Sequence, residues 1–333
     1  MPLLSPIHIA AFTSGAVLGA GSAYYYGSKS VEGVKLSASP PTPVPATNTA
    51  SIPTQAPTPV NSIHNPQDVI KMGFPGPISD LMRREAYITS YDRTKRHPAW
   101  TAQHLTAESL QRDKSAPASD RKNSQFKEDN AIPDKFRARL STYFRSGYDR
   151  GHLVPAADAK SGQNAMDQTF YLTNIAPQVG PGFNREYWAY FETFCRNLTK
   201  DFRHVYVFTL PLYLPTKEID GKWRVRYEVL GDPFSDTPTI SVPTHFGKVV
   251  MGSKDEGHRD LSLAAFVLPN QAIPEQVPLP TFLQSIEKVE RDAGLMLFND
   301  NVKSTAKELC KQVRCEAVVR KFDQFGKQIG SKN

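Results

Sequence analysis

A short polar block near the middle of the chain contains side chains that can move protons and bind phosphate. Asp149, Arg150, Gly151 and His152 follow one another without a gap. A histidine near its reference pKa is substantially neutral at pH 7 and can accept a proton. An arginine presents a fork of donors that matches phosphate oxygens. These residue types indicate the hydrolysis of a phosphate ester, with His152 as the base and Arg150 on the phosphate.

An asparagine and a glutamate further along offer ligands for a hard metal ion. The amide oxygen of Asn184 suits Mg²⁺ or Mn²⁺. Glu192 follows eight positions later in a helical pattern, so the two side chains diverge by about 80° and start about 12 Å apart along the axis. We therefore expect Asn184 to bind the ion directly and Glu192 to hold a metal-bound water or a side chain that does so. The alternatives are a helix cap for Asn184 and a plain exposed carboxylate for Glu192.

Two further residues are assigned supporting roles. Asn174 follows a strand-like run, and we expect it to bind metal waters, to fix the loop of His152 or to end the strand. Asp149 is expected to be structural, because a carboxylate that faced an anionic substrate would repel it. Residues 106–135 are polar and charged. They predict an exposed loop, with a basic phosphate-binding loop as the alternative.

The composition favours an anionic partner. The net charge is +7 and the pI is about 9.2, which suits a nucleic acid or an anionic membrane surface. The chain has three cysteines, too few for a disulfide framework. We interpret Cys195, Cys310 and Cys315 as free thiols, with a bridge between the last two as the alternative.

The N-terminal fifth differs from the rest of the chain. Residues 1–28 contain no Lys, Arg, Asp or Glu, and residues 7–26 form an apolar run about long enough to cross a bilayer. Because cleavable signals and transit peptides carry early positive charge, we expect an uncleaved membrane anchor. Residues 29–66 are rich in Pro, Thr and Ser and predict a disordered tether. Residues 67–333 are then one large globular domain.

The pattern of that domain is typical of an α+β fold with a mixed, mostly antiparallel sheet. Alternating apolar runs flank a polar turn and predict a hairpin of residues 85–91 and 98–105. Further strands and three helices are expected from the same patterns. The strands are residues 205–214, 223–230, 246–251 and 263–268, and the helices are residues 186–199, 281–292 and 304–313.

Three blocks in this order, residues 149–152, 171–178 and 183–192, carry a family resemblance. The chain resembles the DNA/RNA non-specific endonucleases with the Asp-Arg-Gly-His signature and a ββα-metal motif, and within them the mitochondrial endonuclease G branch. The resemblance implies His152 as general base and Asn184 as the sole protein ligand of one divalent ion, Mg²⁺ or Mn²⁺. Glu192 supports that ion, and Arg150 and Asn174 fall on signature positions. An upstream arginine for the scissile phosphate is assigned to Arg121, with Arg112, Lys122 and Lys127 as alternatives.

The resemblance also implies what the chain does. It implies an endonuclease that hydrolyses single- and double-stranded DNA and RNA, leaves 5′-phosphate ends and forms homodimers. It implies attachment to the inner mitochondrial membrane, movement to the nucleus if released, and DNA degradation in apoptosis. Two other functions are compatible with the charge and the anchor: a catalytically inactive nucleic-acid-binding protein of the same fold, and a phosphodiesterase that acts on anionic membrane lipids.

Overall fold

The computed structural model describes residues 68, 71, 80–111, 119–234 and 237–317, all of which belong to one compact unit, residues 59–333. The predicted anchor and the predicted tether lie outside the described residues. Among the residues described, no helix is long and apolar enough to cross a membrane.

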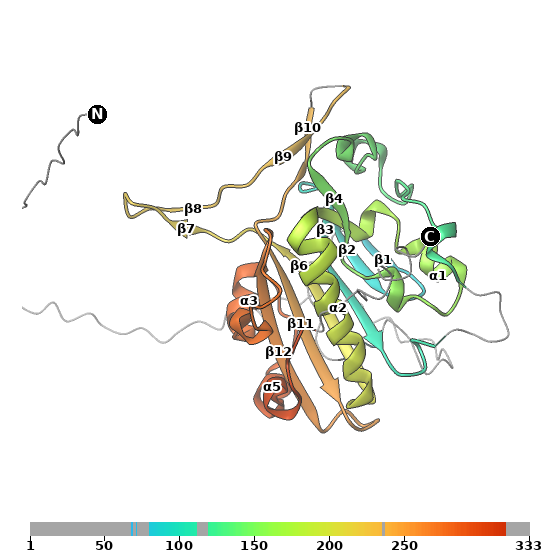
Figure 1. The fold of residues 1–333 in the computed structure, drawn as a ribbon, viewed down its shortest axis with the longest axis vertical. Helices are drawn as coiled ribbons and strands as arrows, with labels where there is room; N and C mark the ends of the chain where they lie inside the picture. Colours follow the sequence, from blue (N-terminus) through green and yellow to red (C-terminus); the bar gives the residue numbers. More distant parts are fainter. Residues whose placement is uncertain (1–67, 69–70, 72–79, 112–118, 235–236, 318–333) are drawn as a thin grey trace, which may run out of the picture. The chain divides into compact units, whose positions relative to one another are not determined.

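The helices and strands alternate irregularly along the chain, as in an α+β fold (Figure 1). The strands are β1 (Leu81–Arg83), β2 (Ile88–Asp92), β3 (His97–Leu105), β4 (Tyr148–His152), β5 (Ile175–Val179), β6 (His204–Leu212), β7 (Thr216–Lys217), β8 (Trp223–Arg224), β9 (Val229–Asp232), β10 (Thr237–Ser241), β11 (His245–Ser253), β12 (Leu261–Pro269), β13 (Leu283–Gln284) and β14 (Lys307–Glu308). The α-helices are α1 (Gln163–Gln168), α2 (Trp188–Asn197), α3 (Ile286–Ala293), α4 (Asp300–Thr305) and α5 (Leu309–Gln312). Short helical turns are η2 (Arg121–Asn123), η3 (Asp134–Phe136), η4 (Ser141–Tyr143), η5 (Ala156–Asp158), η6 (Leu172–Asn174), η7 (Gly180–Tyr187), η8 (Leu198–Lys200) and η9 (Leu279–Phe282).

One large sheet forms the scaffold, in the order β1-β2-β3-β6-β11-β12-β13. These neighbours pair antiparallel, and β14 adds a parallel pairing to β12. The predicted hairpin is confirmed as β2 and β3. The mixed, mostly antiparallel sheet is confirmed as well. The predicted strand at residues 223–230 was only partly right, because β8 and β9 are separate and lie outside this sheet.

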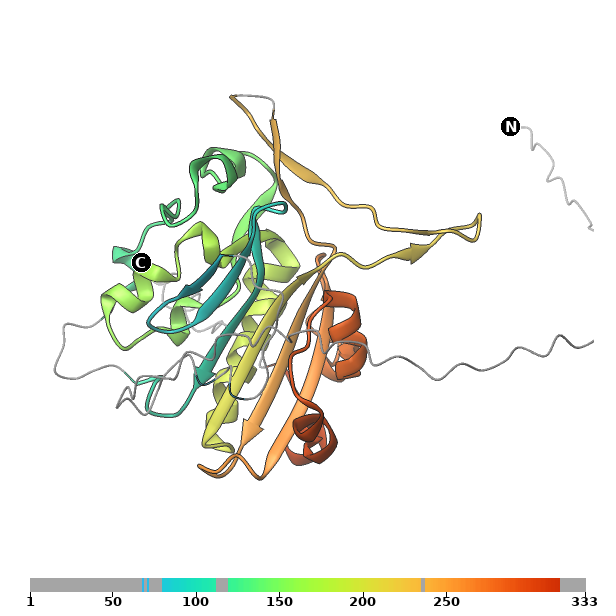
Figure 2. The same ribbon diagram turned by 180° about the vertical axis from the view of Figure 1, so that it is seen from behind.

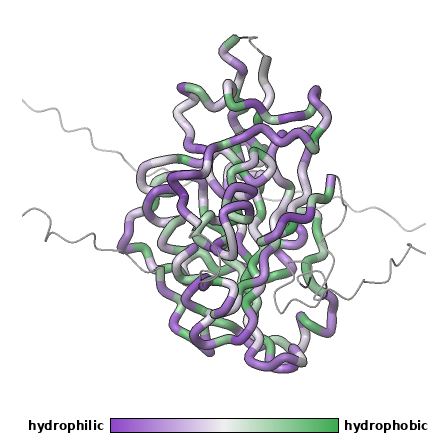
Figure 3. Tube along the Cα trace, turned by 90° about the vertical axis from the view of Figure 1, so that its right-hand side faces the viewer, coloured by the Kyte–Doolittle hydropathy of each residue, from purple (hydrophilic) through white to green (hydrophobic). Residues whose placement is uncertain are grey.

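Alternation along the central strands supplies two cores, one on each face of the sheet. Val205 and Val207 of β6 face a cluster with Trp188 and Phe191 of α2. Tyr206 and Phe208 face a second cluster that includes side chains of α3 and α4. The alternation follows from the two-residue period of a strand. Figure 2 shows the sheet from behind, with the red helix α3 on the face of the sheet opposite to α2. In Figure 3 the hydrophobic residues gather along the inner strands, while hydrophilic residues form most of the outer loops.

The predicted helices differ from the observed ones mainly at their ends. α2 and its flanking turns cover the predicted run at residues 186–199. The run at 281–292 was predicted to begin too early: α3 begins after Ser285, whose hydroxyl caps the amide of Lys288. The run at 304–313 is interrupted, because residues 307–308 pair with β12 and separate α4 from α5.

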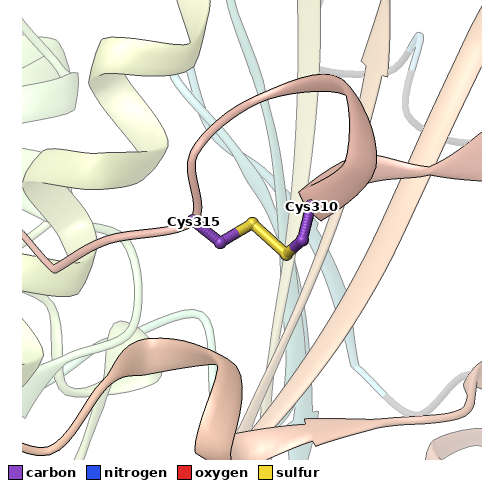
Figure 4. Close-up of a disulfide and its surroundings, with 2 residues drawn as sticks. All are labelled: Cys310 and Cys315. Atoms are coloured by element: carbon purple, nitrogen blue, oxygen red, sulfur yellow. A yellow bond between two sulfur atoms is a disulfide. The ribbon is translucent and has the colours of Figure 1, made fainter.

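A disulfide joins Cys310 and Cys315 (Figure 4). The preferred interpretation of these two cysteines as free thiols was therefore wrong, and the alternative holds. Their separation of five residues brings the two Cα atoms to 5.2 Å, within reach of a disulfide. Cys195 is free, as expected, and it is buried.

Candidate active site

A small two-stranded ladder followed by a helix positions the candidate residues. β4 and β5 pair antiparallel, with His152 opposite Ile175 and Asp149 opposite Gln178. The chain then passes through η7 directly into α2. This ββα arrangement is the motif that the resemblance implied.

Two glycines allow close approaches in this motif. A Cβ at Gly151 would lie 2.0 Å from Oε1 of Gln178, a side chain buried in the ladder. Gly182 has a φ of 77°, and a Cβ there would lie 2.6 Å from the Cβ of Ala272. Only glycine fits both positions without displacing a neighbour. Gly151 thus sets the spacing of the strand that ends at His152.

A cavity of about 310 Å³ lies against this motif. Its lining brings together five of the six residues predicted from the sequence. The lining residues are Arg121, Arg150, His152, Pro155, Ala156, Ala157, Asn184, Arg185, Ala189, Glu192, Thr193 and Arg196. Four arginines and one glutamate give the cavity a positive balance, which suits an anionic ligand.

His152 lines the cavity with 8% of its surface exposed. The rings of Phe126 and Phe170 pack around it, with centroids 5.3 and 4.7 Å away. Burial, reinforced by the charge of Arg121, lowers the pKa of His152 to about 3. Its Nε2 atom has no hydrogen-bond partner within the described part of the chain. At physiological pH the imidazole is therefore neutral, the form in which a histidine can act as a base.

Asp149 orients Asn184 at the edge of the cavity. The Asn184 amide donates from Nδ2 to Oδ2 of Asp149 at 2.8 Å. Since a carboxylate only accepts, this bond directs the amide nitrogen to Asp149 and the carbonyl oxygen away from it. Arg185 donates to both oxygens of the same carboxylate, at 2.8 and 2.6 Å, and this interaction lowers the pKa of Asp149. Asp149 thus stays ionised and holds two lining residues.

Glu192 lies on the face of α2 that borders the cavity, together with Ala189, Thr193 and Arg196. Burial raises the pKa of Glu192 to about 7, against the opposing charges of Lys248 and then Arg196. Arg196 itself is fixed by Asp158, at 2.8 Å, and by the hydroxyl of Thr193. The carboxylate of Glu192 therefore changes protonation near neutral pH.

Two arginines of the cavity rest on the aromatic rings that enclose His152. The guanidinium of Arg150 lies 4.4 Å from the ring centroid of Phe126, and that of Arg121 lies 5.6 Å from the centroid of Phe170. Both residues are exposed, and neither has an ion pair within the described residues. Their charges are available to a ligand.

The donors present fit a single hard cation. Among the residues that the structure describes, no group of three or more His, Cys, Asp or Glu side chains can hold a metal ion. An ion in this cavity would take the Asn184 carbonyl oxygen, with Glu192 in a supporting position, and complete its shell from water and phosphate. Mg²⁺ and Mn²⁺ bind in this way, since they retain several waters.

Comparison with known proteins decides the family. The model of the DNA/RNA non-specific endonucleases matches residues 65–305. The chain belongs to the DNA/RNA non-specific endonuclease family. It is 50% identical over 278 residues to the mitochondrial nuclease of Saccharomyces cerevisiae, covering 81% of this chain and 82% of that protein. It is 40% identical over 242 residues to the human mitochondrial endonuclease G, covering 73% and 76% respectively.

A solved structure shares the fold. The crystal structure of the EndoG/EndoGI complex contains a chain that is 42% identical, with a TM-score of 0.67, covering 76% of this chain and all of that one. The family match and the shared fold therefore agree that this chain is a nuclease.

One predicted site residue of the endonuclease does not line the cavity. Asn174 is fully buried. Its side chain accepts from the amide of Val154 at 3.1 Å and donates to the carbonyls of Val154 and Thr169. Of its three predicted roles, the structure gives it the one that fixes the loop after His152.

Sequence reasoning left several lining residues without a role. Arg185 adjoins Asn184, and Arg196 follows Glu192 by four residues, a spacing that places both on one helix face. These positions relative to Asn184 and Glu192 could have indicated Arg185 and Arg196 from the sequence. Phe126 and Phe170, which enclose His152, gave no such signal, because they reach it from distant segments.

Proposed function

We propose that this chain is a sugar-non-specific endonuclease that hydrolyses phosphodiester bonds of DNA and RNA, single- or double-stranded, and leaves 5′-phosphate ends. The observation that carries the proposal is the neutral His152 in the lining of a cavity that also contains four arginines. Membership of the family supports the choice of nucleic acid as substrate.

The side chains divide the chemistry between them. Arg150 and Arg121 bind the phosphate oxygens through charge-assisted hydrogen bonds. The imidazole of His152 accepts a proton from a water molecule as that water attacks phosphorus. The ionised carboxylate of Glu192 accepts a hydrogen bond from a second water and holds it in place. Asp149 keeps the carbonyl oxygen of Asn184 available. A divalent ion held by that oxygen, Mg²⁺ or Mn²⁺, would stabilise the negative charge of the leaving 3′ oxygen.

A replacement of the base tests this assignment. His152→Ala should slow plasmid and RNA cleavage by about 10²–10⁴ in either metal, because a general base contributes that range. His258→Ala is the matched control, since His258 borders a different cavity. If His152→Ala cuts as fast as the parent chain, the base is assigned to the wrong residue.

Two other functions receive less support. A catalytically inactive binding protein would not need the unpartnered, neutral base, and its cleavage would be absent with or without EDTA. A lipid phosphodiesterase needs an apolar pocket for acyl chains. The cavity instead offers small side chains and arginines. Release of product from DNA and RNA, and none from anionic vesicles, would separate the lipid enzyme from the nuclease.

The location follows from the relatives. Because two of the similar proteins are named as mitochondrial, we place this chain in the mitochondrion. We propose that residues 1–28 anchor it in the inner membrane, that residues 29–66 are its tether, that release would allow entry to the nucleus, and that it forms a homodimer. A fluorescent fusion of residues 1–66 that stays in the cytosol would contradict the targeting proposal.

A further inference from the structure

The short turn that carries Arg121 has no apolar anchor of its own. η2 is a single helical turn of three residues, and none of them is buried. Asp120 caps this turn by accepting from the backbone amide of Lys122 at 2.9 Å. Because a single turn makes few internal hydrogen bonds, it does not fix its own position. The place of Arg121 in the cavity lining therefore depends on what holds the two ends of η2.

One side chain of α1 holds both ends of this turn. Oε1 of Gln163 accepts from the backbone amide of Asp120, at the start of the turn, at 2.8 Å. Nε2 of Gln163 donates to the hydroxyl of Ser124, at the end of the turn, at 3.0 Å. Gln163 thus uses the acceptor and a donor of one amide group on the two ends of the same turn.

Asp167 completes this arrangement one helical turn further along α1. Its Oδ1 atom accepts from Nε2 of Gln163 at 2.8 Å and from the hydroxyl of Ser124 at 2.6 Å. Residues four apart lie on one face of a helix, so the two side chains meet η2 together. The residues Asp120, Ser124, Gln163 and Asp167 are here called the clamp.

α1 is a fixed support that also leads to the ring beside Arg121. Ala165 and Met166 of α1 are buried. Phe170, two residues after the end of α1, lies with its ring centroid 5.6 Å from the guanidinium of Arg121. The same ring packs against His152, with centroids 4.7 Å apart. A movement of η2 relative to α1 would therefore change the distance between the guanidinium and the base.

We propose that Gln163 is a positioning residue, which keeps the guanidinium of Arg121 at the phosphate position of the cavity by holding Asp120 and Ser124. The inference rests on the proposed function, in which Arg121 binds the phosphate oxygens. Gln163 does not line the cavity, so it acts on the substrate only through the turn. A displacement of about 1 Å at a group that positions the substrate can slow a reaction about a hundredfold.

A double-mutant cycle tests the proposal. Gln163→Ala should raise the KM for plasmid cleavage about tenfold and change kcat less, because the hydrogen bonds that hold the turn are lost. In an Arg121→Met background the same replacement should have no further effect, since the turn then carries no guanidinium. Asn164→Ala is the matched control, because Asn164 is the next residue of α1, is exposed and bonds to Glu85. An equal loss in both backgrounds would show that Gln163 only stabilises the fold, and overturns the proposal.

An exchange of functional groups tests the hydrogen bonds of the clamp. Gln163→Glu keeps an acceptor for the amide of Asp120 but places a second carboxylate against Asp167, so it should also raise KM. Adding Asp167→Asn restores a donor between positions 163 and 167. The double variant should therefore recover most of the parent's KM. A double variant no better than Gln163→Glu contradicts the proposed role of these bonds.

Hydrogen exchange tests the clamp without any cleavage. Gln163→Ala should speed the exchange of the backbone amides of residues 119–124, and Asn164→Ala should not. Unchanged exchange in Gln163→Ala overturns the proposal whether or not the chain cuts nucleic acid. A parent chain that cuts neither DNA nor RNA contradicts the proposed function instead, and faster exchange then still supports the clamp. If Arg121→Met cuts as fast as the parent chain, the proposal fails together with the assignment of Arg121 to the phosphate.

Discussion

His152 and Glu192 line the same cavity, and burial moves the pKa values of their side chains in opposite directions. The pKa of His152 falls to about 3, so this base stays neutral throughout the physiological range. The pKa of Glu192 rises to about 7, so its carboxylate loses its charge as the pH falls through neutrality. A histidine base would ordinarily lose activity by protonation below pH 6.5. In this site, the loss at low pH is assigned to the glutamate.

That assignment predicts the pH profile. The rate of cleavage should decrease as the pH falls through about 7, because protonated Glu192 no longer holds a water as an acceptor. Glu192→Gln should be slower at pH 8 and nearly independent of pH between 5 and 8. Initial rates of plasmid cleavage at fixed free Mn²⁺ measure both chains. If the cleavage rate of Glu192→Gln falls below pH 7 as steeply as that of the parent chain, another group titrates.

At the scale of elements, the β4–β5 ladder determines where the base lies. Gly151 precedes His152 in β4, and its backbone passes against the buried side chain of Gln178. α2 supplies the opposite wall of the cavity and is anchored in the core by Trp188 and Phe191. The two walls are therefore held by different interactions.

A methyl group at Gly151 should disturb the β4–β5 side of the cavity and leave α2 in place. Gly151→Ala should destabilise the domain by about 1–3 kcal/mol, as overpacking does, and should slow cleavage because His152 is the next residue. Thermal unfolding and plasmid cleavage measure the two effects. Gly162→Ala serves as the control, since no heavy atom lies within 4 Å of a Cβ there and its φ is −175°. Equal unfolding temperatures for the two variants would refute the steric argument.

The parts of the site that the sequence predicts are those encoded locally. Asp149, His152, Asn184 and Glu192 lie within one continuous stretch, and helical spacing relates the last two. The ring of Phe126 and the partner of Arg196, Asp158, reach the site through tertiary contacts that no spacing reveals. The strand predicted at residues 223–230 is divided into β8 and β9, outside the large sheet, for a similar reason. Alternation indicates a strand but does not identify the strand's neighbour.

At the scale of the whole molecule, a positive net charge attracts nucleic acid from any direction, whereas the cavity is proposed to bind one phosphate. Arg185 and Arg196 are already paired with carboxylates. Arg121 and Arg150 have no ion pair within the described residues and line the cavity. The salt dependence of binding separates the general attraction from the specific contact.

Arg150→Met should reduce the slope of log KM against log salt by about 0.7–0.9, the value of one lost phosphate contact. Lys311→Met removes the same unit of charge from an exposed position in α5 that lies outside the cavity lining, and should leave the slope nearly unchanged. Steady-state cleavage from about 50 to 200 mM salt gives both slopes. Equal reductions would mean that the chain attracts its substrate only through net charge.

The guanidinium groups of Arg121 and Arg150 would also affect what happens after the bond is broken. A diester phosphate within a strand carries one negative charge, but a terminal phosphate monoester carries up to two at pH 7. If cleavage leaves the proposed 5′-phosphate, the same arginines hold that end more tightly than the intact strand. We then expect its departure, rather than the cleavage step, to limit turnover, and short digestion products to act as competitive inhibitors.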